Sequence, residues 1–125
     1  MKLKNQSSPE VIDAALKNDL PRLKALIESD PIRHNVDSHN IECDLMTPLH
    51  IACDARNLEM VRYLVEEAKA DLESFDKWDE TPIFYAVTMG ALDICKYLKD
   101  KGANINHQES MGRTPLYWAA SSGEA

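Results

Sequence analysis

The chain has 125 residues, of which 44% are hydrophobic and 28% charged, a size and composition typical of one folded domain. Fourteen basic and twenty-one acidic residues leave a net charge of −7, which argues against nucleic acid as a partner because its phosphates repel an acidic protein. No apolar run approaches the roughly 20 residues of a membrane-spanning helix, and the polar N-terminus lacks the apolar core of a signal peptide. We therefore expect a cytoplasmic or nuclear protein without membrane insertion.

The first unit is expected to be a polar helix pair with a long loop, residues 9–46, after a short tail of residues 1–8. Ser8-Pro9 is typical of a helix start, because Ser caps free backbone donors and Pro at the first helical position has no amide to leave unpaired. Asp19 is placed to cap the second helix. The stretch 29–46 is longer than its counterparts further along the chain, which predicts an irregular insertion.

A four-residue motif then recurs at intervals of 34 and 33 residues: Thr47-Pro48-Leu49-His50, Thr81-Pro82-Ile83-Phe84 and Thr114-Pro115-Leu116-Tyr117. Each Thr is expected to cap a helix whose first residue is the Pro. The spacing predicts helix–turn–helix units over residues 47–80 and 81–113, and a truncated unit over residues 114–125 that lacks its second helix.

The turns of these units are marked by glycine or by a substitute. Asn57 is expected at the position that Gly90 occupies in the next unit, and Asp79 at the position of Gly112. Lys69 is one residue more than the alignment of the two units requires.

The period of 33 residues, the Thr-Pro-Leu-His motif and the run Gly102–Asn106 resemble the ankyrin repeat family over about residues 9–125. The resemblance implies an all-α solenoid of helix–turn–helix units with hairpin-like loops. It also implies a non-catalytic module for protein–protein interaction, which binds a partner protein or peptide through its hairpin tips and concave face.

No pattern of catalytic, cofactor-binding or metal-ligating residues is present. The sequence contains no Ser-His-Asp constellation, phosphate-binding glycine loop or paired carboxylate motif. The metal-capable side chains gather only in a group whose spacing matches no zinc site: His34, His39, Cys43, His50 and Cys53. For His50, the resemblance implies hydrogen bonds within and between neighbouring repeats. We expect no enzymatic activity, no cofactor and no metal.

The resemblance assigns partner contacts to loop tips and to the ends of first helices, here Asp44, Met46, Asp54, Lys77, Trp78, Glu80, Met89, Met111 and Arg113. Trp78 is the most informative of them, because Trp is enriched among the residues that dominate interfaces. The alternative is that Trp78 packs on Phe75 or on the neighbouring hairpin.

The acidic excess lies entirely in residues 42–80, which contain four basic and eleven acidic residues. Asp76 and Asp79 lie beside the expected binding edge. A basic or basic-amphipathic segment is therefore the favoured ligand, chiefly through electrostatic steering. An acidic surface that merely maintains solubility is the alternative.

The truncated unit leaves Leu116 without a second helix to cover it, whereas stacked repeats need a polar outer cap. The simplest interpretation is that the chain is the N-terminal part of a longer protein. Two alternatives remain: end-to-end self-association through this face, and a role as the binding arm of a larger enzyme whose catalytic domain lies beyond residue 125.

Overall fold

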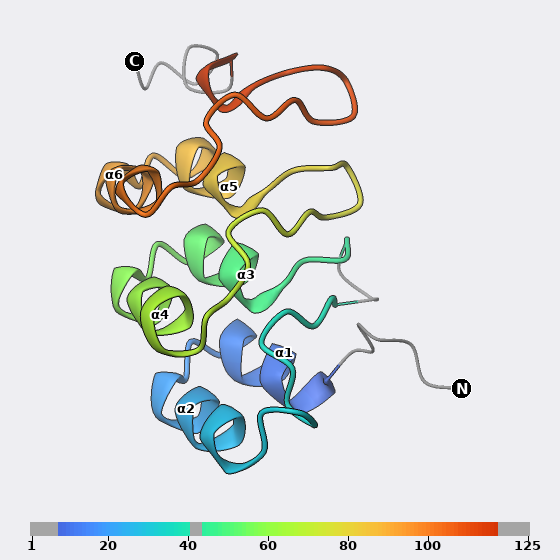
Figure 1. Ribbon diagram of the computed structural model, residues 1–125, viewed down its shortest axis with the longest axis vertical. Helices are drawn as coiled ribbons and strands as arrows, with labels where there is room; N and C mark the ends of the chain where they lie inside the picture. The colour runs from blue at the N-terminus through green and yellow to red at the C-terminus, as the bar shows by residue number, and fades with distance from the viewer. Residues whose placement is uncertain (1–7, 41–43, 118–125) are drawn as a thin grey trace.

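The computed structural model describes residues 8–40 and 44–117, in which three pairs of helices are stacked in chain order (Figure 1). A π-helix, η1, continues the second helix of the middle pair. The pairs are α1 (Pro9–Leu16) with α2 (Leu20–Ser29), α3 (Pro48–Asp54) with α4 (Leu58–Arg62) and η1 (Tyr63–Glu67), and α5 (Pro82–Thr88) with α6 (Leu92–Asp100). The described residues contain no strand, only an isolated bridge between Asn40 and Met46. The predicted all-α solenoid is confirmed.

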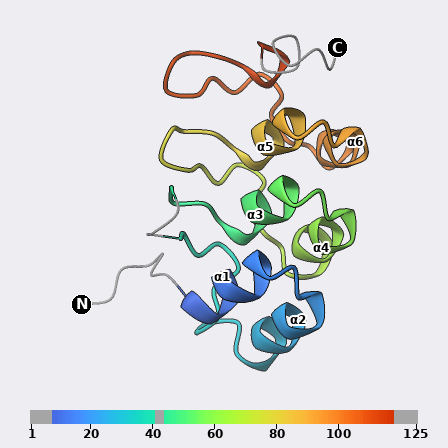
Figure 2. The same cartoon turned by 180° about the vertical axis from the view of Figure 1, so that it is seen from behind.

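The loops that follow the second helices project to one side of the stack, and the second helices α2, α4 and α6 lie on the other (Figures 1 and 2). We call the projecting segments 44–46, 74–80 and 107–113 the hairpin edge. Helix α1 packs on α3, and α3 packs on α5, so the first helices form the centre of the stack.

One continuous core runs through the three pairs, and each pair buries its apolar side chains against its neighbour. Its largest fully buried apolar side chains include Leu23 from the first pair, Leu49 and Leu64 from the second, and Phe84 and Leu98 from the third. Since no pair has a core of its own, the fold depends on stacking, as in other repeat proteins.

The predicted helix caps are confirmed at three starts and wrong at two. Asp19 accepts a hydrogen bond from the backbone N–H of Arg22. Thr47 accepts one from the backbone N–H of His50, and Thr114 accepts one from the backbone N–H of Tyr117 at 3.3 Å. Thr81 forms no such bond, and its buried hydroxyl has no hydrogen-bond partner. The Phe84 backbone N–H bonds the Thr81 carbonyl at 3.0 Å instead. The Thr47 hydroxyl has a further partner in the His50 imidazole at 2.7 Å, whereas the Phe84 side chain has no polar atom.

Ser8 precedes α1 as predicted, but its side chain does not cap the helix. Its hydroxyl donates to the Arg33 carbonyl at 2.7 Å and accepts from the Asn35 N–H at 3.2 Å. Ser8 therefore anchors the long loop after α2 to the start of α1.

The expectation that Asn57 replaces Gly90 is wrong by one residue. Arg56 takes that left-handed position, with φ 58° against 67° for Gly90. Asn57 caps α4 instead, since its side-chain oxygen accepts from the Met60 N–H at 3.1 Å.

The extra residue of the second unit is absorbed by η1. The Ala68 N–H bonds the Tyr63 carbonyl, five residues back, so one wide turn accommodates the additional residue. Lys69 then reverses the chain with φ 59°, at the place where Gly102 does so with φ 100°.

We expect Lys69→Gly to stabilise the protein by about 1 kcal/mol, because a side chain strains a left-handed backbone and glycine does not. Gly102→Ala should destabilise it by a similar amount through the backbone alone, since a Cβ at Gly102 would meet no atom within 4 Å. Urea unfolding of both variants measures these changes. A destabilised Lys69→Gly variant would contradict the expectation.

The fully buried imidazole of His50 joins the second unit to the third. Its Nδ1 accepts the Thr47 backbone N–H at 3.1 Å, so Nε2 carries the proton and donates it to the Glu80 carbonyl at 2.7 Å. The ring also meets Tyr85 edge-on, with centroids 5.2 Å apart. Burial lowers the pKa of His50 to about 4. The resemblance implied hydrogen bonds within and between repeats; by the bounds given above, the hydrogen bonds lie within the second unit, and the contact with the Tyr85 ring joins it to the third.

The depressed pKa of His50 predicts a pH-dependent stability. An unfolded His has a pKa near 6.5, so between pH 6.5 and 4 the unfolded chain binds the additional proton. The stabilisation from neutral His50 is complete above pH 6.5, and up to about 3 kcal/mol of it is lost as the pH falls towards 4.

We expect His50→Phe to lower the free energy of unfolding by about 1–3 kcal/mol at pH 7.5, because the substitution leaves the Thr47 and Glu80 backbone groups unpaired. At pH 4.5 the difference in the free energy of unfolding between wild type and variant should be smaller. Urea unfolding at both pH values measures this difference. An equal difference at the two pH values would contradict the lowered pKa of His50.

Candidate functional site

The hairpin before α5 folds around the carboxylate of Asp76, which is only 3% exposed. One oxygen accepts the backbone N–H groups of Trp78 and Glu80, both at 2.9 Å, and the other accepts the Tyr85 hydroxyl. Asp76 is therefore part of the hairpin's framework. The expectation that it faces a basic partner is wrong, because its oxygens are occupied by the turn itself.

Glu109 organises the next hairpin in the same way. Its carboxylate accepts the backbone N–H groups of Met111 and Arg113 at 2.7 and 2.9 Å, and pairs with the Arg113 guanidinium at 2.9 Å. Burial would raise the pKa of Glu109, but these contacts hold it below its usual range. Both hairpins turn through a left-handed residue, Asp79 (φ 61°) and Gly112 (φ 79°), as the alignment predicted.

Backbone hydrogen bonds tie each hairpin tip to the next. The Lys77 N–H donates to the Asp44 carbonyl, and the Ser110 N–H donates to the Trp78 carbonyl, both at 2.8 Å. Asp44, Trp78 and Met111 occupy equivalent places in successive hairpins, so the tips form one connected edge.

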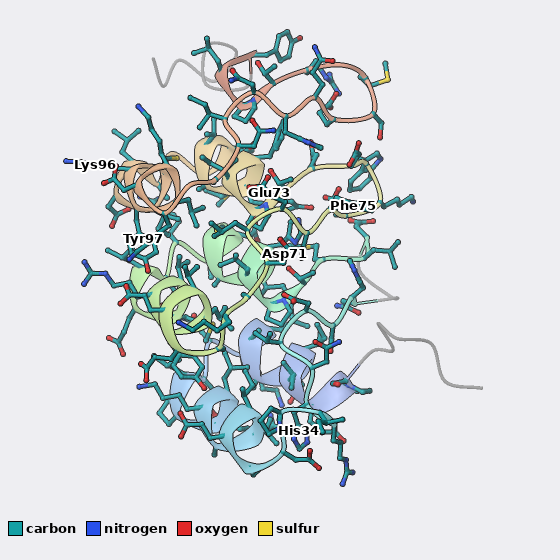
Figure 3. The ribbon with its side chains drawn as sticks, viewed as in Figure 1. His34, Asp71, Glu73, Phe75, Lys96 and Tyr97 are labelled. Atoms are coloured by element: carbon teal, nitrogen blue, oxygen red, sulfur yellow. The ribbon has the colours of Figure 1, made fainter. Side chains whose placement is uncertain are left out.

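Three of the predicted contact residues expose large apolar side chains. Trp78 is 43% exposed and Met111 75% exposed, and Met89 is exposed at the end of α5. The Lys77 ammonium lies 5.4 Å from the centroid of the Trp78 ring. Phe75 is itself exposed, on the projecting hairpin and away from Tyr97 of α6 (Figure 3).

Two predicted contact residues are placed differently from the expectation. Met46 is 7% exposed and packs in the core, so its side chain cannot meet a partner there. Its position precedes Thr47, where the chain has already turned inward. Arg113 is half-buried, and its guanidinium is held by Glu109 and lies 5.7 Å from the Tyr117 ring centroid.

The remaining predicted residues stay at the surface. Asp44 is half-buried, Lys77 is exposed, and Asp54 and Glu80 line a hollow described below. Leu45 and Phe75, which are not among the predicted contact residues, also expose their side chains on the hairpin edge. The sequence signal that could have identified them is an apolar residue next to an acidic residue of the turn, as in Asp44-Leu45 and Phe75-Asp76.

A hollow of about 240 Å³ opens between α3 and α5, lined by Asp54, Glu80, Phe84, Tyr85 and Thr88. Burial raises the pKa of Glu80 to about 7, with the negative charges of Asp76 and Glu109 acting in the same direction. The hollow therefore combines apolar walls with two carboxylates, one of which titrates near neutrality.

Among the described residues, no three His, Cys, Asp or Glu side chains are grouped so as to hold a metal ion. Cys53 is fully buried, and burial raises its pKa far above the usual range. Cys95 is half-buried, and Cys43 lies outside the described residues. No helix in the described part of the chain has the length and apolarity needed to span a membrane.

The start of the fourth unit is helical over residues 115–117, and both Leu116 and Tyr117 are exposed. The remainder of this unit, residues 118–125, lies outside the described part of the chain.

Comparison with known proteins shows similarity to repeat-containing segments of larger proteins. The chain is 31% identical over 107 residues to diacylglycerol kinase zeta of Rattus norvegicus, covering 85% of the chain and 11% of that protein. It is 32% identical over 106 residues to a putative ankyrin repeat protein of Acanthamoeba polyphaga mimivirus, covering 84% and 13%. With NAD-dependent deacetylase sir2B of Dictyostelium discoideum, 28% identity covers 78% and 12%. The chain thus spans about one-eighth of these relatives.

A family model for ankyrin repeats, in three copies, matches residues 11–109, which is most of the chain. Such repeats are generally protein-interaction modules and typically non-catalytic. The stacked helix pairs, the projecting hairpins and the His50 bridge agree with that match. The chain belongs to the ankyrin repeat family.

Proposed function

We propose that the chain is a non-catalytic module that holds a partner protein or peptide along its hairpin edge and the adjoining face of its first helices. The observation that carries this proposal is the row of exposed large apolar side chains on hairpins that are hydrogen-bonded to one another: Leu45, Phe75, Trp78 and Met111. Contiguous exposed apolar side chains mark interaction surfaces, and aromatic residues supply much of their binding energy.

The edge is also held in one shape before any partner arrives. The buried carboxylates of Asp76 and Glu109 fix the two turns, and the tip-to-tip hydrogen bonds fix their spacing. Since few residues must be ordered on binding, little of the interaction energy is lost as entropy. A basic segment is the preferred partner because Asp44, Asp54 and Glu80 lie along this side.

We expect Trp78→Ala combined with Met111→Ala to weaken partner binding at least tenfold, because both side chains are exposed and lie in equivalent places on the edge. The matched control is Ile32→Ala with Leu92→Ala, which removes two exposed apolar side chains elsewhere. Both variants and wild type are used to capture proteins from a lysate, and the captured partner is then titrated against each. Equal affinity for all three would mean that the hairpin edge is not the binding surface.

A second candidate function is that of a binding arm within a larger enzyme. Its support is that a diacylglycerol kinase and a deacetylase are similar to this chain over only 11% and 12% of their own lengths. The exposed Leu116 and Tyr117 would then pack on further repeats; end-to-end self-association is the other way to cover them.

This candidate predicts that the full-length protein is an enzyme. Deletion of residues 9–117 should leave its turnover of a small soluble substrate unchanged. The same deletion should lower its turnover of a protein-bound substrate. Turnover of both substrates by the two forms measures this. A full-length protein without activity on either substrate would exclude the enzyme arm and leave the simple interaction module.

A further inference from the structure

We propose that the hollow between α3 and α5 is the pocket that receives one basic side chain of the partner, and that it favours arginine over lysine. This inference rests on the proposed function and specifies the chemistry of its ligand. The occupant is argued from charge complementarity, from the apolar walls and from the absence of a basic residue in the lining.

Two carboxylates from separate segments of the second unit face the same hollow. Asp54 is the last residue of α3, and Glu80 lies in the hairpin just before α5. Between them, Phe84, Tyr85 and Thr88 of the third unit supply walls that are mainly hydrocarbon. A cation that enters is therefore approached by a carboxylate from the end of α3 and by one from the hairpin, while its stem contacts apolar surface.

No basic side chain of the described residues forms an ion pair with these carboxylates, although Arg113 lies near enough to lower the pKa of Glu80 somewhat. No Lys or Arg lines the hollow, and neither Asp54 nor Glu80 forms an ion pair with a described basic residue. The basic residues nearest in sequence are engaged elsewhere, Lys77 over the Trp78 ring and Arg113 with Glu109.

A larger hollow of about 420 Å³ lies on the other side of the stack, between α2, α4 and η1. Its lining includes Lys24 and Arg62 as well as Glu59, Glu66 and Glu67, so both signs of charge are present. Its two basic side chains offset most of the negative charge of its three glutamates. The contrast makes the smaller hollow the one suited to a basic ligand.

The walls favour a guanidinium over an ammonium. A guanidinium is planar, stacks on aromatic rings and can donate to two carboxylates at once, whereas an ammonium is a compact and strongly hydrated charge. The Tyr85 ring is held in place because its hydroxyl donates to Asp76, so it is a fixed surface for stacking.

The titration of Glu80 adds a pH dependence to binding. Its carboxyl faces Asp76 from its own hairpin, Glu109 and Arg113 from the next one, and Asp54 of α3 across the hollow. The pKa of Glu80 is raised to about 7 by burial and by the neighbouring acids, and a bound cation would lower it again. Binding should therefore release a proton and strengthen between pH 6 and pH 8.

The test titrates N-acetyl-arginine amide into the 125-residue chain. Binding is monitored through the backbone amide NMR signals of Asp54, Glu80 and Thr88. We expect saturable shifts with the arginine probe, weaker binding of N-acetyl-lysine amide, and no saturable shifts with the uncharged N-acetyl-citrulline amide. Affinity for the arginine probe should rise by up to about tenfold from pH 6 to pH 8, because the ionised fraction of Glu80 rises from about one-tenth to nine-tenths.

The variant Asp54→Asn with Glu80→Gln should lose at least tenfold in arginine affinity at pH 8 and lose the pH dependence. Asp100→Asn, which removes the same kind of charge at the end of α6, is the control and should bind as wild type. Thr88→Lys, which places a tethered ammonium in the hollow, should also block the probe. Equal binding of the citrulline probe, or undiminished arginine binding by the double variant, would overturn the proposal.

The pocket and the wider interaction surface can fail separately. The variant Trp78→Ala with Met111→Ala should still bind the arginine probe, since neither residue lines the hollow. If that variant loses the protein partner while the wild-type chain shows no arginine binding, the pocket is wrong and the hairpin edge stands. If the probe binds but the partner is unaffected by either variant, the partner uses another surface.

Discussion

The burial of each helix pair against the next is the interaction on which the rest of this structure depends. The helices have five to ten residues, too few to persist alone in water, and their apolar sides pack both on the partner helix and on the neighbouring pair. His50 strengthens the same contact, because its two ring nitrogens connect Thr47 with the Glu80 carbonyl in the hairpin just before α5 and its ring meets Tyr85 of the next unit. Since the stack supplies the stability, the projecting hairpins are left for recognition.

The acidic residues in and beside the hairpins fall into two groups with different roles. Asp76 and Glu109 are buried, and their oxygens accept backbone N–H groups of their own turns. Their carboxylates therefore stabilise the shape of the hairpin edge. Asp54 and Glu80 face a hollow without a basic partner among the described residues. The negative charge that distinguishes residues 42–80 is thus partly structural and partly exposed for a ligand. Only the second part bears on the proposed preference for a basic segment.

The repeats are not equivalent, and their differences have local physical causes. Where the second unit has His50, the third has Phe84, which meets the His107 ring edge-on at 6.1 Å but leaves the Thr81 hydroxyl without a partner. A buried unpaired hydroxyl costs about 1–3 kcal/mol, so the third unit forgoes polar stabilisation that the second retains. The second unit instead carries an additional residue, which the π-helical turn of η1 absorbs without shifting the stack.

The sequence by itself determined the repeat architecture of this protein, because the Thr-Pro motif and its period depend on local capping and on the stacking of like units. It indicated the helix starts at the Thr-Pro motifs, one extra residue in the second unit, which the structure places in η1 and not at Lys69, and the exposed Trp78 and Met111. Only the tertiary structure decided which polar and apolar residues are free. Met46 and Asp76 lie in the predicted binding edge by position, yet one packs in the core and the other bonds its own turn. Asp54 and Glu80, 26 positions apart, share one hollow because α3 and α5 stack side by side. Burial and pairing across repeats arise from contacts between units, and a linear motif does not encode them.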